Sequence, residues 1–498
     1  MTAPWSGFTP RPVGAPTFSR TMNTSPSTIK RWTLVVVCAA TTMLMLDIAV
    51  VNTALSRIAS DLHTGFNGLQ WVIDAYTLAL ASVVLTVGGL ADRFGRKRLF
   101  TIGLIVFTAA SAVCAAAPEI AVLDAARAVQ GLGAAVMFAV SLAILADAFP
   151  DPRERIGALA AYGATIGGAF AVGPLVGGAL TSGPGWRWIF VINIPLGLAC
   201  LWVCHAYVRE SRDPAGRPVD WPGQIVLIGG LFALVFALLR ANRDGWGSTA
   251  IVVELVGAVV LLICFVLIEA RSRHPLLPLG LFRIPAFTGA QIAVFGISAS
   301  FYGLFFYVSL YLQEVVGLSP IHVGLAYLPV TITVFVVAGA SARLSRRVPY
   351  WLMIAAGLGI AAAGMALMTI AQAGSSWLAL QPGLVLVGVG SGLLQASIAA
   401  VSLGSVAPAQ SGLAAGVNTT FRQGGIAVGV AALGALVPAA SALGGGDRSA
   451  YVAGFHHALL AGAGFAAIAA VAAGVLIGRH TVVERTVPQG HTVLGEAG

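Results

Sequence analysis

Residues 88–98, GGLADRFGRKR, form a short charged segment between two long apolar runs. The runs cover residues 69–90 and 99–117, and each approaches the ~20 residues that a helix needs to cross the ~30 Å hydrocarbon core of a bilayer. Four of the eleven residues in the segment are Arg or Lys, which is typical of a loop on the cytoplasmic side of a membrane. This stretch therefore predicts two membrane-spanning helices joined by a cytoplasmic loop.

The composition of the whole chain is that of a protein embedded in lipid. Hydrophobic residues make up 58% of the 498 positions, charged residues make up 9%, and the mean hydropathy is +0.89. A soluble domain has about 25% charged residues, and a soluble fold of this size could not bury so much apolar surface. The net charge of +9 comes from clusters between apolar runs, so it indicates membrane orientation and no nucleic-acid partner.

The same length test, applied to the whole chain, predicts fourteen membrane helices and an all-α integral membrane fold. Helices are expected because barrel strands would alternate in polarity and be about half as long. The predicted spans are residues 33–53, 69–90, 99–117, 120–146, 157–181, 188–208, 222–240, 250–269, 286–312, 323–341, 350–371, 378–400, 414–438 and 454–477.

The distribution of the 28 Lys and Arg residues supports this number of spans. With both termini in the cytoplasm, most of them fall in cytoplasmic loops, as the positive-inside rule expects. A missed span would place every later Lys- and Arg-rich loop on the outer side of the membrane, against this rule. The exceptions are Arg57, Arg187, Arg240, Arg243 and Arg448 in outer loops, and Arg127 and Arg422 within spans.

The spans divide into two halves of six with an extra pair between them. The predicted parts are a disordered cytoplasmic tail (1–32), a six-helix bundle (33–208), a linker with two additional helices (209–285), a second six-helix bundle (286–478) and a cytoplasmic C-terminal tail (479–498). The segment GASARLSRR at 339–347 is a degenerate repeat of residues 88–98. Duplicated halves of this kind are typical of transporters.

Four motifs, in span one, in the loop after span two, in span four and in span five, resemble those of the major facilitator superfamily. The charged loop contains Gly88, Asp92, Arg93, Gly95, Arg96 and Lys97, and span one contains Leu46, Asp47, Val50, Val51, Asn52, Ala54 and Leu55. Span four contains Arg127, Gln130, Gly131 and Gly133, and span five contains Gly163, Gly167, Gly173, Pro174 and Gly177. The span-one pattern is similar to that of the fourteen-span drug:proton antiporter branch, and the span-five pattern to that of exporters.

The resemblance implies a function as well as a fold. It implies alternating access between two six-helix bundles, proton antiport and efflux of amphipathic compounds such as drugs or antibiotics. The expected partners are an amphipathic small molecule, protons and the lipid bilayer, and the expected location is the cell membrane. We expect a monomer that is driven by the proton gradient and needs no cofactor.

Asp47 is an acidic residue in an otherwise apolar span. An ionised carboxylate inside a membrane is costly, so Asp47 must be paired, hydrated or protonated. The span boundaries place it near the outer end of its helix, about 9 Å deep at 1.5 Å per residue. We interpret it as a proton-coupling residue, and the alternative is a carboxylate held by a hydrogen bond between helices.

Asp74 and Arg127 lie at a depth similar to that of Asp47, about 8 and 10 Å from the outer surface. This common layer permits an Asp–Arg pair that proton binding could break. Asp74 is the second proton-coupling candidate, although it could also be an interfacial residue that reaches water. Arg127, Gln130 and Asn52 are cavity candidates, and Asp124 is a competing partner for Arg127 because it lies three residues away on the same face.

The second half of the chain contains few acidic residues. Between 286 and 477 only Glu314 and Asp447 are acidic, and both fall in predicted outer loops. Proton coupling through carboxylates is therefore expected in the first half. Tyr302, Gln395, Asn418 and Arg422 are candidates for lining a substrate cavity, while Asn418 and Arg422 could equally pack against a cytoplasmic gate.

The charged loop and span five have predicted mechanical roles. The resemblance implies that Asp92, Arg96 and Asp147 could form a salt-bridge network that holds the inner gate while the protein faces outward; they could also fasten loops and set the orientation, and both roles can hold at once. The glycines of span five permit close approach between helices, and Pro174 removes a backbone hydrogen bond and predicts a bend.

Several other functions are disfavoured. Neither lysine, Lys30 nor Lys97, follows a glycine, so a phosphate-binding Walker loop is absent and no nucleotide is expected. The cysteines lie in apolar runs without a completing cluster, so no metal site is expected. A membrane-embedded enzyme, a sensor or a channel ranks below a carrier. Within transport, uptake and export of a single self-made antibiotic remain alternatives, and the substrate is not predicted.

Overall fold

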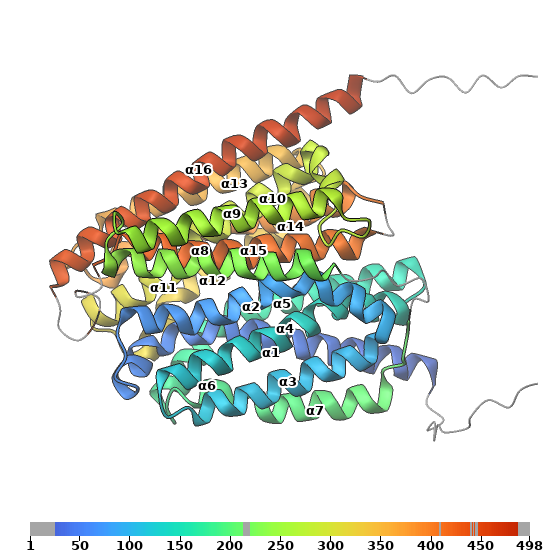
Figure 1. Cartoon of the computed structure of the whole chain (residues 1–498), viewed down its shortest axis with the longest axis horizontal. Helices are drawn as coiled ribbons and strands as arrows, with labels where there is room; N and C mark the ends of the chain where they lie inside the picture. Colours follow the sequence, from blue (N-terminus) through green and yellow to red (C-terminus); the bar gives the residue numbers. More distant parts are fainter. Residues whose placement is uncertain are drawn as a thin grey trace, which may run out of the picture.

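The computed structural model describes residues 25–212, 220–407, 410–438, 441, 443 and 447–486, and these residues contain no strand. Figure 1 shows a bundle of roughly parallel helices. The first turn of α1 and the last turn of α16 lie at the same end of the bundle. This end is called the inner end, and the opposite end the outer end.

The first half of the fold comprises seven helices that make six passes. They are α1 (Pro26–Asp61), α2 (Phe66–Phe94), α3 (Arg96–Ala116), α4 (Ile120–Ala148), α5 (Pro152–Ser182), α6 (Trp188–Val191) and α7 (Asn193–Tyr207). The short helix α6 continues into α7, so the two together make the sixth pass.

The extra pair is α8 (Trp221–Asp244) and α9 (Thr249–Arg271). The second half comprises η1 (Leu279–Arg283), α10 (Pro285–Ile297), η2 (Ser298–Tyr302), α11 (Gly303–Leu310), η3 (Tyr311–Val315), α12 (Pro320–Leu344), α13 (Tyr350–Leu367), η4 (Met368–Ile370), η5 (Trp377–Leu380), α14 (Gln381–Gly404), α15 (Ser411–Gly434) and α16 (Arg448–Thr486). The segments from α10 to η3 form one continuous pass in which η2 and η3 are π-helical.

Fourteen passes are present, as predicted. Thirteen of the described helical segments are long and apolar enough to cross a membrane. The fourteenth pass is α15, whose polar residues, including Asn418 and Arg422, lower its mean hydropathy. It packs along α2, α8 and α10, inside the bundle.

The predicted inner bounds of the two tails and the predicted end of span one differ from the bounds of the helices. Residues 26–32 belong to the first turns of α1, because Ser25 accepts a hydrogen bond from the backbone of Thr28 and Pro26 occupies the first helical position. Residues 479–486 likewise continue α16. The remaining predicted tail residues, 1–24 and 487–498, lie outside the described residues. Because α1 continues to Asp61, Asp47 lies near the middle of the helix rather than near its outer end.

The two halves are in contact at their outer ends through α5 and α12. The backbone of Ile321 donates a hydrogen bond to the Ser182 hydroxyl at 3.0 Å. A Cβ atom added to Gly324 would lie 2.5 Å from the carbonyl oxygen of Pro174, so the two backbones touch there. Glycine is required for this close approach between helices.

The same two helices are apart toward the inner end. The contact face of α5 continues from Pro174 to Gly167 and Gly163, where an added Cβ atom would meet nothing within 4 Å. On α12 the corresponding face continues to Phe335, which is exposed, and to Gly339, which also has open space around it. The structure is therefore closed at the outer end, with α5 and α12 diverging toward the inner end.

This geometry predicts that Gly324→Ala weakens the outer closure. The new methyl group would overlap the Pro174 carbonyl, so α5 and α12 must move apart at the outer end. Spin labels at the outer ends of the two helices should report longer distances in this variant than in the native chain. Gly339→Ala on the same helix is the matched control, because its methyl group meets open space. Identical distance distributions for the native chain and Gly324→Ala would contradict this interpretation.

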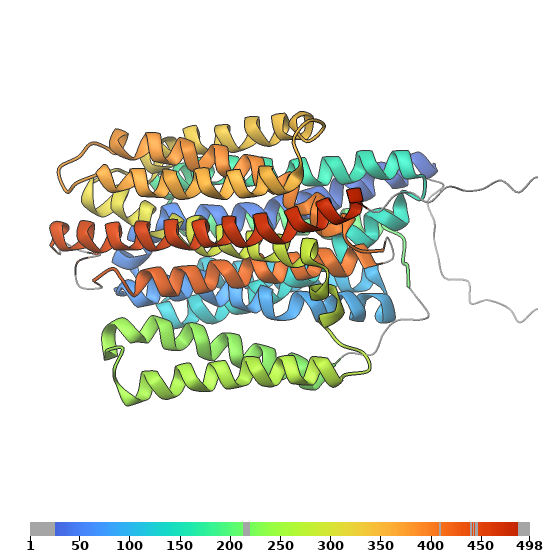
Figure 2. The same ribbon diagram turned by 90° about the horizontal axis from the view of Figure 1, so that it is seen from above.

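The extra pair of helices stands at one edge of the molecule, as Figure 2 shows. Helix α8 packs against α2 and α15, whereas α9 packs against α8. The side chain of Gln224 on α8 donates to the carbonyl oxygen of Ser82 at 2.8 Å and accepts a hydrogen bond from Thr86. This buried polar contact attaches the pair to the first half.

Candidate functional site

Asp47 and Arg127 form an ion pair inside the first half. Nη1 of Arg127 donates to Oδ2 of Asp47, and the two side chains are 2% and 0% exposed, respectively. Nε of Arg127 also donates to the carbonyl oxygen of Val72 at 3.0 Å. The pair joins α1 to α4 and anchors both to α2. Of the three charged residues predicted to share a layer, these two meet.

Amide and hydroxyl groups complete the surroundings of Asp47. Its Oδ1 accepts hydrogen bonds from Nε2 of Gln130 at 2.8 Å and from Nδ2 of Asn193 at 3.1 Å. Ser111 accepts from the same Gln130 nitrogen at 2.8 Å. Asn193 and Ser111 were missed by sequence reasoning. Their signal was modest, since Ser111 shares its apolar span with Thr101 and Thr108, and Asn193 shares its span with His205.

Two aromatic rings cover the guanidinium of Arg127. The ring centroid of Tyr76 lies 4.3 Å from Cζ of Arg127, and that of Phe190 lies 5.8 Å away. This cation–π contact adds to the ion pair. A buried pair with such satisfied hydrogen bonds is stable only while both charges are present, because removing one partner leaves an uncompensated charge that costs about 3–5 kcal/mol.

Two predictions about this region need correction, and one alternative is not observed. Arg127 and Gln130 do not line a cavity between the halves, because both are buried within the first half. The competing partner Asp124 makes no ion pair with Arg127 among the described contacts, and its Oδ1 has no hydrogen-bond partner there. Asn52 is largely buried and donates to the carbonyl oxygen of Ile48 at 3.2 Å. These side chains lie inside a packed bundle, and axial depth alone could not show that.

Asp74 faces the opposite side of α2, away from Arg127. Its side chain is 0% exposed, so it is not the interfacial residue that the alternative interpretation described. Neither carboxylate oxygen has a hydrogen-bond partner among the described residues. It lies one turn from Gln70, on the face of α2 that contacts α15. Within the described part of the chain, Asp74 is therefore a buried acid without a polar partner at the junction of the two halves.

The neighbours of Asp74 connect the halves at the outer end. Nε2 of Gln70 donates to the Tyr307 hydroxyl at 2.9 Å and to the carbonyl oxygen of Val430 at 3.3 Å. Tyr307 also donates to the Val430 carbonyl, and the hydroxyl of Tyr451 donates to the Tyr307 carbonyl at 2.9 Å. Helices α2, α11, α15 and α16 are thus joined by one network. Sequence reasoning missed Gln70 and Tyr307.

The polar residues predicted in the second half come together near its centre. Nε2 of Gln395 donates to the Tyr302 hydroxyl at 2.8 Å, and Arg422 interacts electrostatically with the same tyrosine. Arg422 has no hydrogen bond or ion pair among the described residues. Asn418 lies one turn from Arg422, and its buried Nδ2 is without a partner in the described part of the chain.

Tyr302 also contacts the first half. Its ring meets Phe170 of α5 edge to face, with centroids 5.4 Å apart. Tyr302 ends the π-helical turn η2, a distortion that often occurs at functional sites. Tyr302, Gln395, Asn418 and Arg422 are only half-buried and lie near the middle of their passes. This set, with Phe170, has the aromatic and polar character of a small-molecule site.

The charged loop is built around Gly95 and an acid that the sequence did not suggest. Gly95 has φ 110°, which favours glycine. It separates α2 from α3, and the carboxylate of Glu210 accepts hydrogen bonds from the backbone of Lys97 and Arg98, both at 3.1 Å. Glu210 thereby caps α3, and its negative charge is favourable at a helix N-terminus.

The predicted inner network is only partly formed. Asp92 at the end of α2 and Arg96 at the start of α3 make a salt bridge at 2.8 Å across the break at Gly95. Asp147 is exposed and shares no hydrogen bond or ion pair with either of them in the described residues. The network was predicted for an outward-facing state, so its inclusion of Asp147 stays a prediction. Nζ of Lys97 donates to the carbonyl oxygen of His205 at 2.9 Å, and Arg93 lies over the Phe94 ring. Gly88 has open space around it.

Gly95→Ala should lower the melting temperature of the protein. A Cβ atom there would lie 2.7 Å from Oε1 of Glu210, and the positive φ costs a non-glycine residue about 1–2 kcal/mol. The measurement is the melting temperature of the purified protein, with Gly88→Ala as the control in the same loop. Equal melting temperatures of the two variants would contradict the assigned role of Gly95.

The glycines of α5 differ in how closely a neighbouring helix approaches them. An added Cβ atom on Gly177 would lie 2.5 Å from the Thr53 hydroxyl and 2.7 Å from the Val50 carbonyl oxygen, and Gly173 is packed against Ala49. The predicted close approach is therefore confirmed for these two, whose partner is α1. Gly163 and Gly167 have no such neighbour in this conformation. Pro174 lies inside α5, as predicted.

Comparison with known proteins agrees with this architecture. The family model described as Major Facilitator Superfamily matches residues 37–430. The chain is 36% identical over 410 residues to the puromycin resistance protein pur8 of Streptomyces alboniger, covering 82% of this chain and 81% of that protein. It is 34% identical over 396 residues to the drug efflux pump JefA of Mycobacterium tuberculosis, covering 78% and 77%.

A solved structure with the same fold is a peptide transporter, POT, in complex with sulfate. The TM-score is 0.64 at 16% sequence identity, and the match covers 91% of this chain and 99% of that one. At this identity the likeness concerns the fold, including the arrangement of the two bundles.

Proposed function

This chain belongs to the major facilitator superfamily, and we propose that it exports amphipathic small molecules across the cytoplasmic membrane in exchange for protons. It is a multi-pass membrane transporter of small molecules rather than an enzyme. The relatives named as a resistance protein and an efflux pump support export. We further propose that the chain acts as a monomer without a cofactor, with the inner end in the cytoplasm.

The observation that carries the proposal is the buried Asp47–Arg127 pair. A carboxylate and a guanidinium in this environment attract each other strongly because the dielectric constant is low. Protonation of Asp47 removes one charge and releases Arg127, which then favours a different arrangement of α1, α2 and α4. Proton binding and a movement of the first half are thereby linked.

Asp74 provides a second link between protons and conformation. An ionised carboxylate without a partner is costly in a dry interface, so closure of the outer end requires Asp74 to be neutral. When the outer end opens, water reaches Asp74 and the charged form becomes acceptable. Release of a proton from Asp74 would then hold the outer end open.

The substrate is proposed to bind to the half-buried set in the second half. Phe170 and Tyr302 offer aromatic surfaces, and Gln395 and Asn418 offer hydrogen bonds. Arg422 has no acidic partner among the described residues, so it is available for an electron-rich group of the substrate. The set lies where α5 and α12 diverge, which gives access from the inner end.

The direct test is transport in proteoliposomes that contain the purified chain. We expect an imposed pH gradient to drive accumulation of puromycin or ethidium, used as amphipathic probes, and the gradient to collapse faster in their presence. Dissipating the gradient with an ionophore should stop accumulation. Substrate movement in the same direction as protons would instead indicate uptake, and movement that is indifferent to the gradient would contradict antiport.

A further inference from the structure

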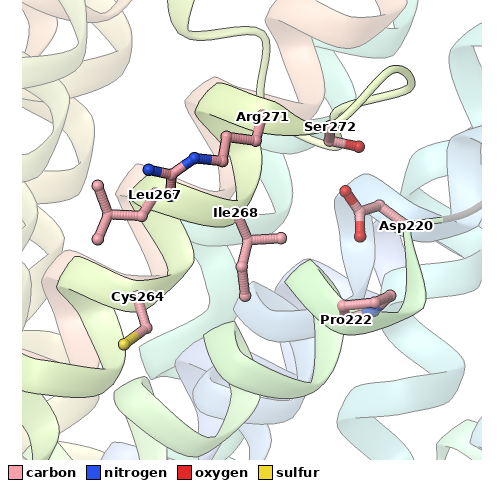
Figure 3. Close-up of a pocket in the computed structure, with 7 residues that line it drawn as sticks. All are labelled: Asp220, Pro222, Cys264, Leu267, Ile268, Arg271 and Ser272. Atoms are coloured by element: carbon pink, nitrogen blue, oxygen red, sulfur yellow. The ribbon is translucent and has the colours of Figure 1, made fainter.

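A shallow trough lies at the inner end of the extra helix pair, outside both six-helix bundles. Its volume is about 560 Å³, and its lining comes from the start of α8 and the end of α9. Figure 3 shows Asp220 on one side of the trough, Arg271 on the other, and Ile268 between them. The pair stands at the edge of the molecule (Figure 2), and the lining residues Leu267 and Arg271 are exposed there.

The acidic side of the trough has buried carboxylate oxygens that lack partners. Asp220 is 8% exposed, and its Oδ1 accepts a hydrogen bond from the backbone of Gly223 at 2.9 Å. Glu269 is 3% exposed, and its Oε2 accepts one from Leu277 at 2.9 Å. Oδ2 of Asp220 and Oε1 of Glu269 have no hydrogen-bond partner among the described residues.

The two carboxylates are neighbours. A Cβ atom added to Gly223 would lie 2.6 Å from Oε1 of Glu269 and 3.3 Å from Oδ1 of Asp220. Two buried acids this close repel each other unless a cation or a proton lies between them. Asp220 borders the trough, so a cationic group placed there would compensate both charges.

The rest of the trough is complementary to a lipid. Arg271 is exposed and makes no hydrogen bond or ion pair in the described part of the chain, so its guanidinium is free to bind a phosphate. Leu267 and Ile268 make an apolar wall, and Leu267 belongs to the exposed face of α9, which also includes Val256, Val260 and Ile263. Trp221, exposed beside Asp220, is a residue typical of the membrane interface.

We propose that this trough binds the headgroup of an amine-bearing zwitterionic phospholipid, such as phosphatidylethanolamine. The ammonium group donates hydrogen bonds to Oδ2 of Asp220, with Glu269 behind it, and Arg271 binds the phosphate. The acyl chains follow the exposed face of α9. A metal ion would explain the two carboxylates but would leave the apolar wall and Arg271 without a role. A lipid contacts the carboxylates, the apolar wall and Arg271.

Titration of the delipidated full-length protein with defined lipids, followed by native mass spectrometry, tests this site. We expect phosphatidylethanolamine to bind about tenfold more tightly than phosphatidylcholine, whose quaternary amine cannot donate a hydrogen bond, and than phosphatidylglycerol, which has no amine. Asp220→Asn should remove this preference, and its folding is protected because Asn also caps helices well.

The phosphate contact is tested separately. Arg271→Gln should weaken the binding of phosphatidylethanolamine and phosphatidylcholine alike, because both carry the phosphate. Arg273→Gln is the matched control, since Arg273 is exposed two residues further on and does not line the trough. Equal affinity of the native chain for the three lipids, or an unchanged preference in Asp220→Asn, would overturn the proposal.

Discussion

Replacing Asp47 with Asn is expected to abolish proton-driven transport while substrate binding remains. Asn keeps an oxygen that can accept hydrogen bonds from Gln130 and Asn193, but it cannot take up a proton or pair with Arg127. Transport driven by a pH gradient should fall to the level of empty liposomes. Binding should persist because Asp47 is buried within the first half, apart from the half-buried set around Tyr302.

Two further variants separate coupling from stability. Asp61→Asn is the matched control, since Asp61 lies on the same helix in an exposed ion pair with Arg187 at 3.2 Å, and such pairs contribute at most about 1 kcal/mol. It should transport normally. Adding Arg127→Gln to Asp47→Asn should raise the melting temperature above that of the single variant, because it removes the uncompensated charge. If Asp47→Asn carries out coupled transport at the native rate, the Asp47–Arg127 pair has a structural role and no role in proton coupling.

Replacing Asp74 with Asn is expected to fix the outer end in its closed state. Asn resembles the neutral acid, so the charge that would open the interface can no longer form. In the native chain, raising the pH should lengthen distances between spin labels at the outer ends of α2 and α15. In Asp74→Asn these distances should stay short at every pH, and transport should stop.

Gln70→Ala is the control for this second prediction. It removes hydrogen bonds to Tyr307 and Val430 in the same network without removing the acid. This variant should open more readily at all pH values but keep its pH response. The groups that face Asp74 are Gln70 on its own helix and Tyr307 on α11, and no cation interacts with it among the described residues. A pH response that survives in Asp74→Asn would assign the switch to another group.

The sequence predicted the spans well because membrane length and charge asymmetry are local properties. It singled out Asp47, Asp74 and Arg127 as candidates for the same reason, since ionisable residues stand out in apolar runs. It could not predict that Arg127 pairs with Asp47 and that Asp74 faces the other half. Which residues pair depends on the direction in which each side chain points around its helix. The depth of a residue along the helix axis gives no information on that direction.

Partners distant in sequence were also out of reach. Glu210 caps α3 although it lies far along the chain from Lys97 and Arg98, and no local pattern links them. Asn193 joins Asp47 from the sixth pass only because α7 packs against α1. The contrast between Gly177, which is tightly packed against α1, and Gly163, which has open space around it, likewise depends on where neighbouring helices meet α5.

The central claim is that Asp47 exchanges protons as the substrate binds. The most direct measurement is proton release from purified, lightly buffered protein when a saturating concentration of puromycin or ethidium is added. The native chain and Asp61→Asn should release protons, and Asp47→Asn should release distinctly fewer while binding the probe with similar affinity. Equal release from all three proteins would contradict proton antiport through Asp47.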